Sequence, residues 1–180
     1  MSSKRSAYRV GLAALFAFGA AVVRPAAAQI TLGSPADPPR IALGAGAFDI
    51  VPDSKKPASG PAALLSGEYR FGDVLWVVSP FVGLSGTSKG AFYGYGGFGF
   101  DVNFDHNWVF TPNFAGGYFY RGDGINLGSW WEFRSGAELD YRFDNLSRIG
   151  IAFYHMSNAG LTKQNPGAEL ATLVYTVPLR

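Results

Sequence analysis

The sequence predicts an eight-stranded antiparallel transmembrane β-barrel, and three observations support this prediction. Aromatic residues make up 16% of the 180 residues, and the chain has 24 glycines and no cysteine. Apolar and polar side chains alternate through eight segments, each close to or somewhat above the ~9–11 residues of a tilted membrane-spanning strand. A secretory leader precedes these segments, and none of them has the ~18 consecutive apolar residues of a transmembrane helix.

Residues 1–28 have the features of a cleaved signal peptide, which leaves residues 29–180 as the outer-membrane barrel. A basic region with Lys4 and Arg9 is followed by an apolar run and by three alanines before Gln29. This leader holds four basic and no acidic residues, so the remaining chain has 11 basic against 13 acidic side chains. A nucleic-acid partner is therefore not expected.

The first three predicted strands lie at 41–51, 61–72 and 74–84. The first is rich in glycine and alanine, and its sequence does not show which side chains share a face. The second alternates apolar side chains with Glu68 and Arg70. The third carries bulky apolar residues at every second position. Alternate residues of a strand point to opposite faces, so both the second and third strands have one apolar and one mixed or polar face.

The remaining predicted strands lie at 92–103, 108–120, 130–143, 147–157 and 169–178. The fourth has phenylalanines on one face and tyrosine, aspartate and asparagine on the other. The fifth is bounded by a short turn and a long loop. The sixth has the clearest pattern, with aromatic and aliphatic side chains alternating with charged ones. The last two have strongly apolar faces that end in polar residues at their shared loop.

The connections between these segments favour a membrane barrel over a soluble one. Short turns on one side and long loops on the other are typical of outer-membrane barrels, whose apolar faces point to lipid. A barrel of eight strands is narrow, so we expect side chains of opposite charge to fill its interior and pair there. The long loops are 52–60, 121–129 and 158–168, the medium loop is 85–91, and the short turns are 72–73, 104–107 and 144–147.

Three residues of a hydrolase site meet at the last hairpin. His155 and Ser157 lie two apart at the end of one strand, and Glu169 opens the next strand. By strand alternation all three share the apolar faces of Phe153 and Leu173. A serine nucleophile, a histidine general base and a carboxylate that orients the base are the components of a catalytic triad.

Other chemical patterns in the sequence are weaker. The spacing Gly94-x-Gly96-x-x-Gly99 matches a dinucleotide-binding fingerprint, but it lies inside an alternating strand with no helix after it. His106 lies in a short turn and lacks nearby metal-ligating partners. We therefore expect no metal and no cofactor.

The segment from Phe153 to Gly160, with Asn165-Pro166-Gly167 and Glu169 after it, resembles the signature of the outer-membrane lipid A 3-O-deacylases. The match is confined to about 153–169; elsewhere the likeness is one of architecture. The resemblance implies a Ser157–His155–Glu169 triad on the outer wall of an eight-stranded barrel. It implies a serine esterase of the cell outer membrane that hydrolyses the 3-O-acyl ester of lipid A and releases a 3-hydroxy fatty acid.

Around the triad, the local candidates for oxyanion donors are Asn158, Gly160 and Asn165. Ile151, Phe153 and Leu173 are expected to form the wall along which acyl chains lie. Lipid A, as part of lipopolysaccharide, is the expected partner, and both a monomer and a homodimer are compatible with the sequence. Two alternatives stay open: a non-enzymatic barrel that serves as an adhesin or stabilises the envelope through its long loops, and an acyltransferase barrel. In the first, the three polar residues would only mark the rim of the membrane.

Overall fold

The computed structural model describes residues 30–33, 37–52, 58–72, 74 and 77–179. The predicted signal peptide, residues 1–28, lies outside the described residues. No helix among the described residues is long and apolar enough to cross a membrane.

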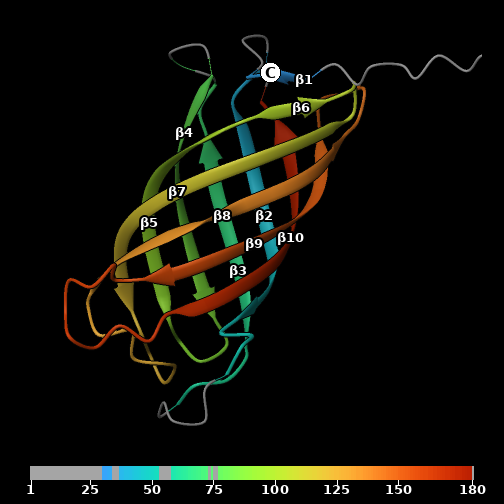
Figure 1. Cartoon of the computed structure of the whole chain (residues 1–180). Helices are drawn as coiled ribbons and strands as arrows, with labels where there is room; N and C mark the ends of the chain where they lie inside the picture. The colour runs from blue at the N-terminus through green and yellow to red at the C-terminus, as the bar shows by residue number, and fades with distance from the viewer. Residues whose placement is uncertain (1–29, 34–36, 53–57, 73, 75–76, 180) are drawn as a thin grey trace, which may run out of the picture.

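The chain forms a closed antiparallel barrel, as the sequence predicts (Figure 1). Every strand from β2 to β10 pairs with its neighbours in one sheet, and the β7–β8 pairing closes the sheet on itself. Among the described residues, closure leaves no open edge on the long strands of the wall, as a barrel in lipid requires, and the short β1 pairs on one side with β6. The strands are β1 (Ile30–Leu32), β2 (Arg40–Phe48), β3 (Ala62–Arg70), β4 (Val78–Thr87), β5 (Phe92–Phe100), β6 (Val102–Phe104), β7 (Trp108–Tyr120), β8 (Trp131–Arg142), β9 (Arg148–Ser157) and β10 (Ala168–Pro178).

The barrel wall is eight strands around, because β5 and β6 are two parts of the predicted fourth strand. Both pair with β7, and only Asp101 separates them. Beyond the last β4–β5 pair, β6 takes β1 as its other partner. The backbone N–H of Gly33 donates to the carbonyl of Asp101, 2.7 Å away. The short N-terminal strand thus continues the sheet beyond the first residue of β4, Val78.

The predicted third strand begins later than expected. It was predicted from residue 74, but β4 begins at Val78, and Val74 forms only an isolated bridge to Val78. The predicted turn 72–73 is therefore part of a longer connection. The opposite error occurs at 85–91, because β4 continues through Thr87 and the connection shrinks to 88–91.

The two ends of the barrel differ (Figure 1). The end of β10, β1 and the turns 105–107 and 143–147 lie at one end, at the top of the view. The loops 121–130 and 158–167 lie at the other, which we call the loop end.

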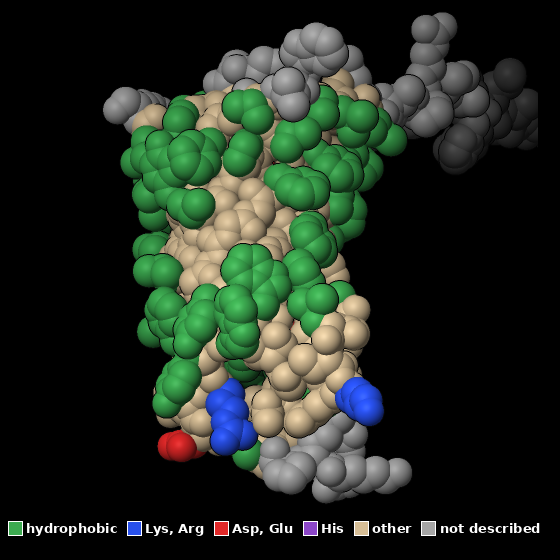
Figure 2. All heavy atoms as spheres, turned by 90° about the vertical axis from the view of Figure 1, so that its left-hand side faces the viewer, with side chains coloured by type: hydrophobic (Ala, Val, Ile, Leu, Met, Phe, Trp, Pro, Cys, Tyr) green, Lys and Arg blue, Asp and Glu red, His purple; other side chains and the backbone are tan. Residues whose placement is uncertain are grey.

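The outer surface of the barrel is apolar (Figure 2). Large hydrophobic side chains on several strands are at least half exposed, including Leu65, Leu84, Phe98, Ile151 and Leu173. The charged side chains visible in this view lie at the loop end. An apolar wall around a polar interior reverses the arrangement of a water-soluble barrel and is the arrangement of a membrane barrel.

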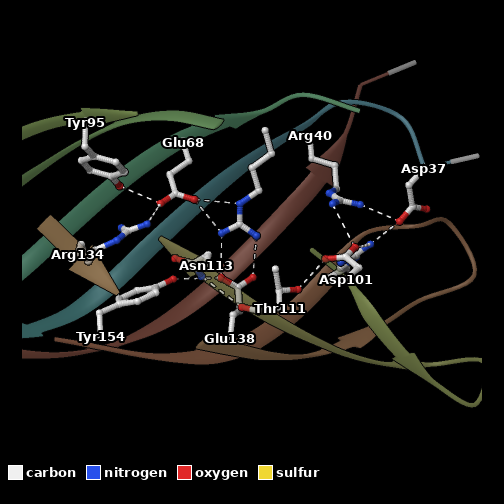
Figure 3. A network of polar contacts seen from close by, with 12 residues as sticks. Asp37, Arg40, Glu68, Tyr95, Asp101, Thr111, Asn113, Arg134, Glu138 and Tyr154 are labelled. Atoms are coloured by element: carbon white, nitrogen blue, oxygen red, sulfur yellow. Dashed lines mark hydrogen bonds and ion pairs between the residues drawn. The ribbon is translucent and has the colours of Figure 1, made fainter. Parts of the chain in front are cut away.

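The interior holds two groups of ion pairs (Figure 3) as well as a cluster of buried apolar and aromatic side chains, among them Phe48, Phe119 and Met156. In the first, Arg70 pairs with Glu138 through two nitrogens, each 2.8 Å from an oxygen, and with Glu68 at 2.9 Å. Arg134 also donates to Glu68 at 2.9 Å and lies over the ring of Tyr154, 4.2 Å from its centroid. The predicted internal pairing is thus present. The carboxylate of Glu132 is an exception, since its oxygens have no hydrogen-bond partner among the described residues.

The second group lies toward the end of the barrel opposite the loops. Asp101 accepts from Arg148 at 2.7 Å, from Arg40 at 3.5 Å and from the Thr111 hydroxyl at 2.7 Å. Asp37 pairs with Arg40 at 2.8 Å and also contacts Arg148. These groups are buried and mutually paired, so the barrel wall is supported from inside.

Candidate active site on the outer wall of the barrel

The three predicted catalytic residues lie together at the loop end of the wall. His155 and Ser157 are at the end of β9, and Glu169 is the second residue of β10. Burial alternates along β9, with Ile151, Phe153 and His155 facing outward. The structure therefore places the site on the exterior face that the sequence pattern predicts.

The strand register brings His155 and Glu169 into contact. They are directly opposed in the β9–β10 ladder, and His155 Nδ1 lies 3.3 Å from Glu169 Oε1. The imidazole is 48% exposed and the carboxylate 30% exposed, so both remain accessible from outside the barrel. A carboxylate in contact with Nδ1 fixes the orientation of the ring and leaves Nε2 for the reacting group.

Ser157 is half-buried on the same face, opposite Phe133 of β8. Ser157 and His155 both lie in the described range 77–179, and no hydrogen bond joins their side chains. A second hydroxyl lies nearby, because Ser135 of β8 is directly opposed to His155 and also faces outward. The sequence analysis did not select Ser135, since its proximity to His155 depends on the register between β8 and β9.

A tight turn begins directly after Ser157. The residues Ala159 and Gly160 have φ angles of 52° and 81°, and the N–H of Leu161 donates to the Asn158 carbonyl at 3.0 Å. Two successive positive φ angles are those of a type I′ turn. The Asn158 Oδ1 atom accepts from Gly160 N–H at 3.0 Å, which holds the turn together.

Asn158 also ties two loops together. Its side chain is fully buried, and Nδ2 lies 2.8 Å from the Leu127 carbonyl, 2.8 Å from the Gln164 carbonyl and 3.0 Å from Thr162 Oγ1. Leu127 belongs to the loop 121–130, whereas Gln164 belongs to 158–167. The side chains of Thr162 and Gln164 also donate to carbonyls of the other loop, those of Gly128 and Asn126, but the Asn158 amide is the buried member of this set.

The three predicted oxyanion donors have different surroundings. The Asn158 N–H donates to Asn165 Oδ1 at 3.0 Å, and the Gly160 N–H donates to Asn158. Both backbone donors thus already have acceptors within the loop. Asn165 is exposed, and its Oδ1 is held by the residue after Ser157. No hydrogen bond links its Nδ2 to another described residue.

An apolar groove lies on the wall near the candidate site, and its lining begins one row of outward-facing residues away from His155. The predicted groove residues Ile151, Phe153 and Leu173 all line it, and its volume is about 680 Å³. In the row next to His155, the small residues Ala137 and Ala171 flank Phe153. Because the side chains on both sides of Phe153 are small, the wall is recessed there and forms part of the groove. No cluster of three His, Asp or Glu side chains in the described ranges is placed to hold a metal ion.

The sequence matches the model of a protein family over residues 60–178, and the description of that family is lipid A 3-O-deacylase, PagL. The chain belongs to the PagL family. The match covers every strand from β3 to β10 and the positions of the three candidate residues, so the family resemblance drawn from the last hairpin is confirmed. Membership supports lipid A 3-O-deacylation as the activity of the chain in broad terms. No curated protein sequence gives a significant match.

The solved structure of PagL confirms the fold of this PagL family member. The crystal structure of the outer membrane enzyme PagL superposes with a TM-score of 0.62 at 21% identity, over 78% of this chain and 99% of that one. A de novo designed transmembrane β-barrel gives a TM-score of 0.47 at 14% identity, over 81% of this chain and 99% of the design. The Yersinia pestis outer membrane protein Ail gives 0.45 at 11% identity, over 77% and 99%.

Proposed function

We propose that this protein is an outer-membrane serine esterase that hydrolyses the 3-O-acyl ester of lipid A in the outer leaflet. Ser157 is the nucleophile, His155 the general base and acid, and Glu169 the group that orients His155. The observation that carries the proposal is the 3.3 Å contact between His155 Nδ1 and Glu169 Oε1 on the exterior face that also holds Ser157.

The reaction proceeds in two steps. Ser157 Oγ attacks the ester carbonyl carbon while its proton passes to His155 Nε2, and the tetrahedral intermediate then expels the sugar oxygen, which takes that proton. Water next attacks the acyl–serine ester, gives its proton to His155 and releases the 3-hydroxy fatty acid. The proton returns from His155 to Ser157 Oγ. A hydrogen bond between Ser157 and His155 forms as substrate binds, since catalytic hydrogen bonds are often long before that point.

Asn165 is the proposed donor to the oxyanion. Its Oδ1 is fixed by the N–H of Asn158, so Nδ2 is held in one direction next to Ser157. An oxyanion donor needs this kind of prior orientation. Asn158 and Gly160, by contrast, use their donors to build the turn.

The groove accounts for a substrate that stays in the membrane. The acyl chain would lie against Ile151, Phe153 and Leu173, with its ester at Ser157 and the sugar at the level of the loops. The chain passes from the hydrocarbon of the leaflet to an apolar wall, so its binding there requires no transfer from water. This arrangement delivers the ester sideways from the leaflet, so the substrate never has to enter water.

The test is mass spectrometry of lipid A from cells that express the wild type or Ser157→Ala. The wild type should convert lipid A to a species that lacks one 3-hydroxyacyl chain, and free 3-hydroxy fatty acid should appear. Ser157→Ala should leave lipid A intact while the barrel still reaches the outer membrane in equal amount. Deacylation by Ser157→Ala at the wild-type rate would reject Ser157 as nucleophile. Transfer of the acyl chain to another lipid, without free fatty acid, would indicate an acyltransferase.

A further inference from the structure

Gly167 lies directly against the imidazole of His155. It is buried, immediately precedes β10 and has a φ angle of 71°. A Cβ atom at this position would lie 2.6 Å from His155 Cε1, 3.3 Å from Nε2 and 3.6 Å from Nδ1. Real Cβ contacts essentially never fall below 3.0 Å, so any side chain here would displace the ring.

The contact involves the edge of the ring that matters for the chemistry. Cε1 lies between the two nitrogens, and Glu169 already contacts Nδ1. The imidazole is rigid, so a push on Cε1 moves both nitrogens together. The contact to Glu169 and the approach of Nε2 to Ser157 would therefore change at the same time.

We infer that Gly167 is a positioning residue for His155, and this inference rests on the catalytic roles proposed above. The absence of a Cβ allows β10 to approach the imidazole closely enough for the His155–Glu169 contact. Glu169 contacts the ring at Nδ1, and the backbone of Gly167 lies against the ring near Cε1. A displacement of about 1 Å in a catalytic group can reduce a rate by roughly 10²-fold.

Gly167 could also be required only because of its positive φ angle, and the chain offers a control for that. Gly90, in the connection 88–91, has a φ of 73°, and a Cβ there would have no neighbour within 4 Å. Gly90→Ala therefore imposes the same backbone strain without touching His155. The difference between the two variants isolates the contact with the ring.

The experiment measures lipid A deacylation by purified full-length Gly167→Ala and Gly90→Ala in detergent micelles. We expect kcat to fall by roughly 10²-fold or more in Gly167→Ala with little change in KM, because the lost interaction acts in the transition state. Gly90→Ala should stay near the wild-type rate. Equal activity of the two variants would overturn the inference.

A second comparison separates positioning from general damage to the loop. In a His155→Ala background, Gly167→Ala should cause no further loss of the residual rate, because its effect passes through the imidazole. A further loss of tenfold or more there would show a structural role and overturn the inference. If instead His155→Ala and Ser157→Ala themselves keep wild-type activity, the proposed catalytic roles fail, and that result does not depend on Gly167.

The contact can also be tested without any substitution, which covers the case in which Gly167→Ala does not assemble. The chain has two histidines, so the His155 ring is readily assigned by comparison with His155→Ala. Nuclear Overhauser spectra of the wild-type protein in micelles should show contact between His155 Hε1 and the Gly167 α-protons. The absence of that contact in a folded, active sample would overturn the inference.

Discussion

Glu169 Oε1 lies 3.3 Å from His155 Nδ1, and the two residues are directly opposed on β10 and β9. The pairing is set by backbone hydrogen bonds along the whole β9–β10 ladder, so the orientation of the imidazole is a property of the barrel wall. Sites built on strands hold their side chains more precisely than sites built on loops alone.

The first prediction concerns the charge of Glu169. Glu169→Ala should lower kcat by roughly 10²- to 10⁴-fold, less than Ser157→Ala, because an orienting group is partly dispensable. Glu169→Gln keeps the size and an acceptor oxygen and should fall between Glu169→Ala and the wild type. The measurement is the rate of fatty acid release from lipid A in micelles. The control is Asp123→Ala, which removes an exposed carboxylate in the loop 121–130. A wild-type rate for Glu169→Ala would exclude Glu169 from the mechanism.

The second prediction concerns the groove. Phe153 is 54% exposed on the wall between Ala137 and Ala171, so Phe153→Lys places a charge where acyl chains are proposed to lie. An ammonium group placed against an acyl chain costs free energy, and a cost of only about 1.4 kcal/mol corresponds to roughly tenfold. Hydrolysis of lipid A should therefore fall at least that much more than hydrolysis of a short water-soluble ester.

The matched control for the groove is Leu84→Lys. Leu84 on β4 is 58% exposed on the outer wall and lies away from the site. Its substitution introduces the same charge on the apolar wall, so any general effect of the charge on the barrel should appear in both variants. Equal losses on the two substrates in Phe153→Lys would mean that the groove does not bind the chain.

The third prediction concerns the buried charges. Arg134 pairs with Glu68 at 2.9 Å and packs between the rings of Tyr95 and Tyr154. Arg134→Ala leaves a buried carboxylate with one partner fewer, and breaking such a pair usually costs about 3–5 kcal/mol. The free energy of unfolding, measured with urea in lipid vesicles, should fall accordingly. Arg121→Ala, at an exposed loop position, should change it by less than about 0.5 kcal/mol. Equal free energies of unfolding for Arg134→Ala and the wild type would show that the internal pairs contribute little.

The strand pattern could be predicted from the sequence because alternation reports which side chains share a face. The limits of β7 agree with the predicted range, and the outward phase of His155 is as expected. Alternation does not report where a ladder ends. Val74 and Val78 have the same phase, yet β4 begins only at Val78, opposite the last residue of β5. The break at Asp101 depends on pairing with β1, a contact between distant parts of the chain.

The site was predictable where its spacing lies within one hairpin, and less so where it depends on neighbouring strands. The placement of His155, Ser157 and Glu169 on one outward face follows from spacing and phase, and their catalytic roles stay a prediction. The position of Ser135 opposite His155 requires the β8–β9 register, and the role of Asn158 as a link to Leu127 requires the packing of two loops. Gly167 looks like an ordinary turn glycine in the sequence, since only the structure shows the ring beside it.

The last prediction concerns the link between the two long loops. Asn158→Ala removes the amide that reaches Leu127, Thr162 and Gln164. The carbonyl of Leu127, a buried residue, then loses its donor, which costs about 1–3 kcal/mol, whereas the Gln164 carbonyl keeps the Thr162 hydroxyl as donor. The loop 158–167 should open more often, while the barrel, which is stabilised by its ladders and internal ion pairs, should remain folded. Lys163 in this loop is exposed, so trypsin should cleave there faster in Asn158→Ala than in the wild type.

Lipid A deacylation should fall with the same substitution, because opening of the loop would draw Asn165 away from the backbone N–H of residue 158 that fixes it beside Ser157. Asn107→Ala is the matched control, since Asn107 donates to the Arg142 carbonyl at 2.9 Å at the opposite end of the barrel. It removes a similar amide without touching the loops. If Asn158→Ala is cleaved at Lys163 no faster than the control and keeps full activity, the loop is held by other contacts. Faster cleavage with full activity would instead mean that Asn165 does not need a fixed loop to assist Ser157.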